Sequence, residues 1–236
     1  MHKLFKPFID LIAPPLCILC ENPVKDKLIC VNCENEIDRN LAIKKNFCLK
    51  CGGIFEGNRC PRCRDTKFSF EFNRSVYIYD GKVKQIVEDF KYNKFKKLSD
   101  FIAGRMQELL AREYPKIHVL IPIPIHPTRK RERGFSQTEL IAKKLSSLTG
   151  INCDCENLIR IKHTKSQATL TRKERKSNLK DAFKLIEPSR FRNQNVLLID
   201  DVMTTGITMN EAAKILKKHG ARVYTITFAI AFYQNL

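Results

Sequence analysis

The chain has 236 residues, 43% of them hydrophobic, so it can bury a core without the help of disulfide bonds. It carries 43 Lys and Arg residues against 25 Asp and Glu residues, and the net charge of +18 favours polyanionic partners such as nucleic acid, phosphorylated molecules or an anionic membrane face. A basic composition that serves only solubility is the alternative. Lys6, Pro7 and Asp10 interrupt the apolar N-terminal residues, which argues against a signal peptide or a spanning helix and predicts a cytoplasmic protein that is not an integral membrane protein.

The N-terminal segment is defined by cysteines. Eight of the ten form CxxC pairs, namely Cys17 and Cys20, Cys30 and Cys33, Cys48 and Cys51, and Cys60 and Cys63. Four such pairs predict two tetrahedral zinc sites with four cysteine ligands each, whereas disulfides would need an oxidising compartment and a redox CxxC usually occurs once. Consecutive pairs or alternating pairs can share an ion, and we favour consecutive pairs. Residues 1–66 are therefore predicted to be a zinc-ribbon domain with an architectural or partner-binding role and little core of its own.

Residues 67–236 have a different pattern, in which strands alternate with helices. The predicted elements are a strand at Ser75–Tyr79, helices over 83–90 and 98–110, a strand at Val119–Pro124, a helix at Ser136–Leu148, a strand at Val196–Ile199, a helix at Thr208–His219 and a strand at Arg222–Ala231. Such alternation predicts an α/β domain with a mostly parallel sheet flanked by helices. The isolated pair Cys153 and Cys155 is interpreted as ordinary surface or edge cysteines.

The stretch VLLIDDVMTTGITM, residues 196–209, carries the clearest chemical pattern. An apolar strand is predicted to end at Asp200 and Asp201, and the loop Met203–Thr208 then leads into a helix. Backbone N–H groups, threonine hydroxyls and the helix dipole favour a phosphate at that loop, while the two carboxylates would repel it and suit hydroxyl groups or Mg²⁺. A ribose 5-phosphate has both features. A Walker B strand is the rival interpretation, but the chain has no GxxxxGK[ST] sequence.

The motifs resemble those of the ComF family, which has a zinc-ribbon domain followed by a type I phosphoribosyltransferase-like domain. VLLIDDVMTTGIT is similar to the signature for phosphoribosyl pyrophosphate (PRPP), and two further segments, IPIPIHPTRKRERGFSQTELIAKKL and TKSQATLTRKERKSNLKDAF, are similar to other family motifs. The chain departs from the family pattern at Ile207, where relatives often have a small residue, and at Ser136, which replaces an asparagine.

The resemblance implies a role for each matching position. Asp200 and Asp201 would hold the ribose hydroxyls, directly or through Mg²⁺, and the turn at His126–Thr128 would cradle pyrophosphate. The implied PRPP-binding residues are Asp200, Asp201, Met203, Thr204, Thr205, Gly206, Ile207, Thr208 and His126, together with Gln167, Arg172 and Arg175 in a segment that would close over the ligand. Guanidinium groups and Mg²⁺ suit a pyrophosphate leaving group.

Charge beyond the needs of PRPP predicts a second partner, single-stranded DNA. The candidate contacts are Lys91, Lys94, Lys96, Lys97, Arg129, Arg131 and Arg133. The aromatic residues near them, Phe90, Tyr92, Phe95, Phe101 and Phe135, are candidates for stacking on bases, although about half are expected in the core.

The family implies DNA uptake across the inner membrane in natural transformation, with a helicase and a membrane channel as further partners. That role would place the protein in the cytoplasm, including the inner face of the membrane. The alternative is an active phosphoribosyltransferase in nucleotide metabolism or salvage, and the sequence leaves open whether any transfer occurs, because no base pocket is recognisable.

Overall fold

The computed structural model describes residues 14–25, 27–93, 95–162, 179 and 181–232. The helices are α2 (Val31–Asp38), α3 (Pro61–Asp65), α4 (Gly81–Tyr92), α5 (Leu98–Glu113), α6 (Pro127–Arg133), α7 (Gln137–Thr149) and α9 (Ile207–Lys218), with 3-10 turns η1 (Ala42–Lys44) and η3 (Pro188–Phe191). The strands are β1 (Asn73–Ile78), β2 (Val119–Pro122), β3 (Asn152–Cys153), β4 (Leu158–Arg160), β5 (Phe183–Leu185), β6 (Asn195–Met203) and β7 (Arg222–Ile230).

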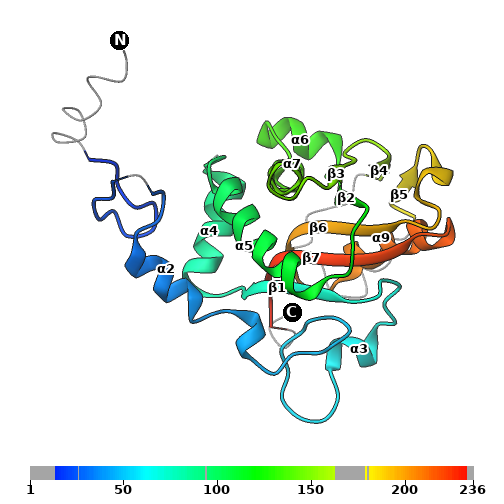
Figure 1. The fold of residues 1–236 in the computed structure, drawn as a ribbon, viewed down its shortest axis with the longest axis horizontal. Coiled ribbons are helices and arrows are strands. Elements are labelled where there is room, and N and C mark those ends of the chain that lie inside the picture. Colours follow the sequence, from blue (N-terminus) through cyan, green and yellow to red (C-terminus); the bar gives the residue numbers. More distant parts are fainter. Residues whose placement is uncertain (1–13, 26, 94, 163–178, 180, 233–236) are drawn as a thin grey trace.

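Five strands form one parallel sheet in the order β1–β7–β6–β2–β3 (Figure 1). β4 and β5 form a separate antiparallel pair. The central strand β6 is apolar on both faces, as a parallel strand covered by helices must be. Leu197 and Ile199 contact one core, and Val196 and Leu198 contact the other. The predicted α/β architecture is therefore confirmed.

Each face of the sheet is covered by its own set of helices. One core contains the buried faces of α4, α5 and α7, whose apolar residues recur at helical spacing, as Val83, Ile86, Val87 and Phe90 do in α4. The other contains α9 and Phe191 of η3. α4 begins after Asp80, whose Oδ1 accepts a hydrogen bond from the Gly81 N–H. Because the two cores lie on opposite faces, the edge where the strands end is left to the connecting loops.

The acidic pair lies inside the strand, contrary to the sequence-based prediction. β6 continues to Met203, so Asp200 and Asp201 are not its last residues. The reason is the neighbouring strand: β7 pairs with β6 through Asp200↔Thr227 and Met203↔Ile230, and these backbone bonds extend the strand past the acids. Alternation then points the two adjacent carboxylates to opposite faces.

The cysteine-containing segment contributes to both cores, and its helix α2 contacts α4. Cys17, Cys33 and Ile37 belong to the core beneath α4 and α5, whereas Cys51 and Ala42 belong to the core beneath α9. We expected this segment to have little core of its own, and the structure shows that its buried residues belong to the same two cores as those of the sheet. The predicted division at residue 66 stays a prediction.

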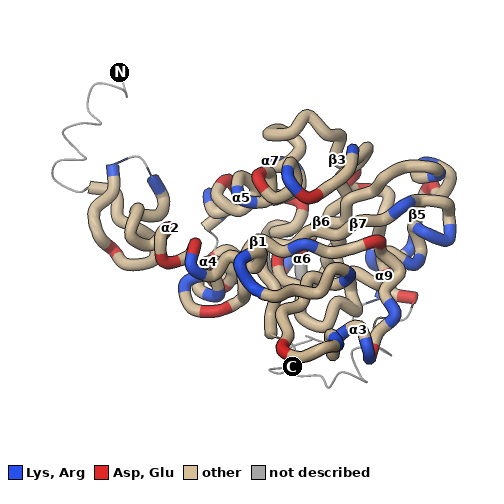
Figure 2. The backbone as a smooth tube through the Cα atoms, turned by 60° about the horizontal axis from the view of Figure 1, so that its bottom comes forward, with Lys and Arg blue, Asp and Glu red and all other residues tan. Residues whose placement is uncertain are grey.

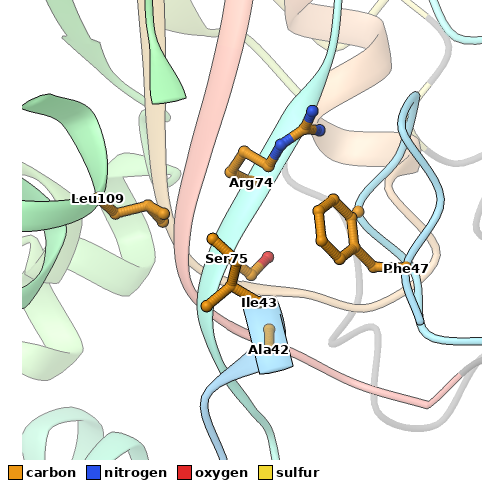
Figure 3. A pocket seen from close by; sticks show the side chains of 7 residues that line it. Ala42, Ile43, Phe47, Arg74, Ser75 and Leu109 are labelled. Carbon is orange, nitrogen blue, oxygen red and sulfur yellow. The ribbon is translucent and has the colours of Figure 1, made fainter. Parts of the chain in front are cut away.

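A small cavity marks the seam between the cysteine-containing segment and the sheet (Figure 3). Its volume is about 10 Å³, which is room for one water molecule at most. Residues of η1, β1 and α5 line it, together with two from the second cysteine segment, namely Ala42, Ile43, Phe47, Gly52, Arg74, Ser75 and Leu109. The seam is packed like a protein interior, so this cavity is no candidate for a ligand site.

Candidate functional site

Asp201 is held by a lysine from a distant helix. Lys91, in the last turn of α4, places its Nζ 2.9 Å from Asp201 Oδ2, and the two side chains are 21% and 12% exposed. The Asp201 N–H donates a hydrogen bond to Asp200 Oδ1 over 2.9 Å. The acidic pair is therefore one electrostatic unit with Lys91, although the lysine lies more than a hundred residues earlier in the sequence.

The environment of Asp200 makes this carboxyl group less acidic than usual. Burial, followed by the negative charge of Asp201, raises the pKa of Asp200 from 3.8 to about 7, although Lys91, the Asp201 N–H and Arg160 oppose the shift. Burial works against the charged form of Lys91, but the carboxylates of Asp201 and Asp200 outweigh it and raise the pKa of the lysine. Near neutral pH the site thus holds a charged lysine and an Asp200 that readily gains or loses a proton.

The TTG loop, Met203–Thr208, reverses the chain tightly between β6 and α9. Gly206 has φ +78°, and a Cβ atom there would lie 2.5 Å from Met203 Cε and 2.8 Å from Phe68 Cε1, so only glycine fits. Gly206 is also the N-cap of α9 and supplies no side chain to the first turn. The 12-residue helix therefore begins with backbone donors and a favourable dipole, the arrangement that holds phosphate groups.

Side chains of the TTG loop divide between the core and the surface. Met203, Thr205 and Ile207 are buried, and the Thr205 hydroxyl accepts a hydrogen bond from the Ile207 N–H over 3.4 Å. Thr204 and Thr208 are half-buried. Met203 and Ile207 thus offer a ligand only their backbone. Ile207 packs into the core with its side chain, which explains how a large residue is accommodated there.

The segment that follows β2 contains His126. Its last backbone hydrogen bond to β6 is made by Ile123, three residues before His126. Ile123 donates its N–H to the Ile199 carbonyl, so the segment that follows leaves the sheet at the same edge as Asp200. The expected pyrophosphate turn at His126–Thr128 is the start of helix α6, with His126 as its N-cap and its Nδ1 accepting from the Thr128 N–H. Pro127 at the first helical position favours a helix over an open turn.

The structure distributes the predicted DNA contacts unevenly. Lys91 belongs to the acidic site, whereas Lys96, Lys97 and Arg131 are exposed. Gln167, Arg172, Arg175 and Lys94 lie outside the described residues, as do the side chains of Arg129 and Arg133. Charge in a sequence does not say which way a helix faces, and the ion pair of Lys91 with Asp201 was not expected from it; the role of Lys91 in DNA binding stays a prediction.

The aromatic residues also separate into core and surface. Phe90 and Phe135 are buried and their rings are 6.0 Å apart, and the Phe101 ring packs edge-on against Phe228. Tyr92 and Phe95 are 66% and 43% exposed. Two of the five stacking candidates therefore remain on the surface.

The eight CxxC cysteines gather into two groups of four. Cys17, Cys20, Cys30 and Cys33 form the first cluster, and Cys48, Cys51, Cys60 and Cys63 form the second; within each, the sulfur atoms lie within 4.8 Å of one another. The favoured consecutive pairing is confirmed, and the alternating arrangement is excluded. Four thiolates at this separation fit tetrahedral zinc and leave no position open for catalysis. Lys82 Nζ lies 3.3 Å from Cys33 Sγ, a cation beside a group that becomes anionic with zinc.

Comparisons with known proteins agree with this architecture. Residues 8–67 match the family model of the double zinc ribbon domain, and residues 132–235 match that of the phosphoribosyl transferase domain. The chain is 31% identical to competence protein F of Haemophilus influenzae over 219 residues, which are 86% of this chain and 91% of the relative. The chain belongs to the ComF family.

Two other relatives are less similar in sequence but also align with this chain over most of its length. The DNA utilization protein YhgH of Escherichia coli K12 is 28% identical, with coverage of 89% of this chain and 94% of the relative. Competence protein ComFC of Bacillus subtilis is 26% identical, with coverage of 86% and 95%. The two cysteine clusters and the phosphoribosyltransferase domain therefore lie in a chain that aligns with these relatives over most of its length. Among the described residues, no helix is both long enough and apolar enough to cross a membrane.

Proposed function

We propose that the site formed by Asp200, Asp201 and the TTG loop binds PRPP together with Mg²⁺. The observation that carries this proposal is the start of α9 at Gly206, an N-cap residue without a side chain, shortly after two carboxylates on the preceding strand. The loop N–H groups and the hydroxyls of Thr204 and Thr208 would hold the 5-phosphate. The carboxylates would hold the ribose hydroxyls, and Mg²⁺, when bound, would supply positive charge between them and the pyrophosphate.

Lys91 has a defined part in this proposal. Its ion pair keeps Asp201 neutralised while the site is empty, and a cationic or hydroxyl-bearing ligand must compete with it. His126, whose Nδ1 accepts from the Thr128 N–H, lies at the same edge of the sheet and is proposed to contact the pyrophosphate. The segment with Gln167, Arg172 and Arg175 is proposed to contact the pyrophosphate.

Calorimetric titration tests the PRPP proposal. PRPP with Mg²⁺ should give saturable heat with the wild-type protein and none with Asp200→Asn/Asp201→Asn. A suitable control is Asp154→Asn, which makes the same chemical change at a buried aspartate outside the proposed site. Asp154 lies in the turn after β3, where it accepts hydrogen bonds from the N–H groups of Glu156 and Asn157. Equal heats in the wild type and the double variant would disprove the assignment of the carboxylates.

We further propose that the surface after α4 binds single-stranded DNA. Tyr92 and Phe95 are exposed, and the exposed Lys96 and Lys97 follow Phe95 directly in the chain. Figure 2 shows basic positions around α4 and, elsewhere on the molecule, around β5. Stacking on exposed rings contributes about 1–3 kcal/mol per base, and lysines neutralise phosphates without reading sequence. This combination supports binding of unpaired strands over a specific duplex sequence.

Fluorescence anisotropy with a labelled oligonucleotide tests the DNA proposal. Tyr92→Ala/Phe95→Ala should weaken binding of single-stranded DNA about tenfold or more, in line with the loss of one or two stacked bases. Lys96→Gln/Lys97→Gln should lower the salt dependence of binding. A matched control is Leu148→Ala, which removes an exposed apolar side chain on α7 (39% exposed). Affinities for single-stranded DNA that stay unchanged in both double variants would disprove the assignment of this surface.

A role in DNA uptake is the biological function we propose, because relatives over nearly the whole chain are a competence protein and a DNA utilization protein. Such a protein would act in the cytoplasm, at the inner face of the membrane, with a helicase and a channel as partners. The second candidate is phosphoribosyl transfer, supported by the match to the phosphoribosyl transferase domain. Pyrophosphate release with an acceptor, abolished in Asp200→Asn, would favour transfer, whereas DNA binding that survives this substitution would favour a separate DNA surface.

A further inference from the structure

The TTG loop rests on the segment that follows the second cysteine cluster. The Phe68 ring lies against the bare Cα of Gly206, since a Cβ there would be 2.8 Å from Phe68 Cε1. Phe68 is 6% exposed and stacks on Phe70 with ring centroids 4.8 Å apart. The Ser69 N–H donates to Asn210 Oδ1, in the first turn of α9, over 2.7 Å. Two separate contacts, from Phe68 and from Ser69, thus hold the loop and the start of α9 in place.

A second connection runs from the cluster itself to the loop. Arg62, in α3 between Cys60 and Cys63, is 1% exposed and donates from Nη2 to the Ala231 carbonyl over 2.9 Å. The Ala231 N–H donates to the Met203 carbonyl over 3.0 Å. Ala231, which directly follows β7, therefore joins the second zinc ribbon, the segment that holds the cysteines of the second cluster (residues 48–63), to the first residue of the TTG loop.

Arg62 also lies beside the sulfur atoms of its own cluster. A Cβ at Gly53 would lie 2.5 Å from Arg62 Nη1 and 3.2 Å from Cys51 Sγ, so the guanidinium and the sulfur flank the same small residue. A zinc ion bound by four thiolates has a net charge of −2, and a buried cation beside it stabilises that charge. Arg62 therefore has one contact toward the metal centre and one toward the TTG loop.

The first cluster has a different connection. Its neighbouring cation is Lys82, at the start of α4, and its cysteines belong to the core on the other face of the sheet. Among the described residues, Phe68 and Ser69, which follow the second cluster, contact Gly206 and Asn210, and Arg62 of the second cluster reaches Met203 through Ala231. The two clusters can therefore be tested against each other.

We propose that the second zinc ribbon positions the TTG loop, with Phe68 and Arg62 as positioning residues, so that weaker zinc binding at the second cluster loosens the loop and weaker zinc binding at the first does not. The inference rests on the proposed function for the identity of the ligand. According to this inference, the second zinc ribbon does more than stabilise the N-terminal part of the chain, because it also holds the ligand-binding loop in place.

Hydrogen exchange of the peptide that contains residues 203–210 tests the inference in the zinc-loaded full chain. Phe68→Ala should speed exchange in this peptide and weaken PRPP about tenfold, whereas Phe68→Leu should restore most of both. Phe72→Ala is the matched control, because Phe72 lies four residues further on and packs against Tyr114 and Tyr224. It should leave exchange of the loop at the wild-type rate.

Arg62→Met and Lys82→Met compare the two clusters. Each should weaken zinc at its own cluster by about 10–100-fold, measured as release of one of two zinc ions to a chromogenic chelator. The loop should exchange faster in Arg62→Met only, and Arg62→Lys should partly restore it. Unchanged loop exchange in both Phe68→Ala and Arg62→Met, or equal effects in Phe72→Ala and Lys82→Met, would overturn the inference. Absence of PRPP binding to the wild type would refute the proposed function alone, since loop exchange is measured without ligand.

Discussion

Replacing Lys91 with methionine should destabilise the empty protein and make it more responsive to Mg²⁺. The substitution keeps the length of the side chain and removes the charge that lies 2.9 Å from Asp201. Loss of one partner from a buried ion pair costs about 3–5 kcal/mol, and the exposures of 21% and 12% reduce this, so we expect about 2–3 kcal/mol. For a chain of this length that is a fall of roughly 5–10 °C in melting temperature.

Thermal unfolding of zinc-loaded protein, with and without Mg²⁺, measures this effect. Lys84→Met is the control on the same helix, because Lys84 is 55% exposed and lies 4.0 Å from Glu88, so its removal should cost under about 1 kcal/mol. Without Lys91, Mg²⁺ no longer has to compete with the lysine for Asp201. At a Mg²⁺ concentration of 100 times its Kd, binding should add about 2.7 kcal/mol to the free energy of unfolding. A Lys91→Met protein that melts within a degree of wild type without Mg²⁺, or that gains no more from Mg²⁺ than wild type does, would refute the electrostatic argument.

Four further outcomes follow from the site and the zinc clusters. The pKa of about 7 at Asp200 means that the empty folded state holds a proton more tightly than the unfolded chain, so its stability should fall as pH rises from about 4 to about 7. PRPP–Mg²⁺ affinity should instead rise through pH 7 with proton release, seen by calorimetry in two buffers of different ionisation heat, and Asp200→Asn should remove both trends. Gly206→Ala should cost about 2–4 kcal/mol in urea unfolding, because strain and a clash combine, whereas Gly150→Ala, with φ +72° and open space, should cost about 1 kcal/mol; equal costs would contradict the clash. Removing zinc withdraws about 10–16 kcal/mol per site, comparable with the whole stability of a domain. Since both clusters share the core of the sheet, the chain should then lose its cooperative melting transition, and a phosphoribosyltransferase domain that melts unchanged would show an independent core.

The sequence by itself determined the features that depend on local spacing. A CxxC pair can place two thiolates on one ion because only two residues separate them, so eight cysteines in four pairs predicted two zinc sites. Periods of two and of 3.6 residues located the strands and helices of the sheet domain, and the residue at which the helix was predicted to begin, Ser136, is the N-cap of α7 and accepts a hydrogen bond from the Glu139 N–H. The sequence of the TTG loop, with a glycine before a helix, likewise predicted a phosphate-binding shape from local chemistry alone.

Only the tertiary structure decided which distant residues complete the site. Lys91 meets Asp201, and Phe68 meets Gly206, across more than a hundred residues, and no local pattern encodes such contacts because burial is set by the packing of whole helices and strands. The position of Asp200 and Asp201 inside β6 depended on the hydrogen bonds of β7, a neighbour that lies later in the chain. The seam that joins the zinc ribbons to both faces of the sheet was invisible for the same reason, because shared burial is a property of the folded chain and not of either segment.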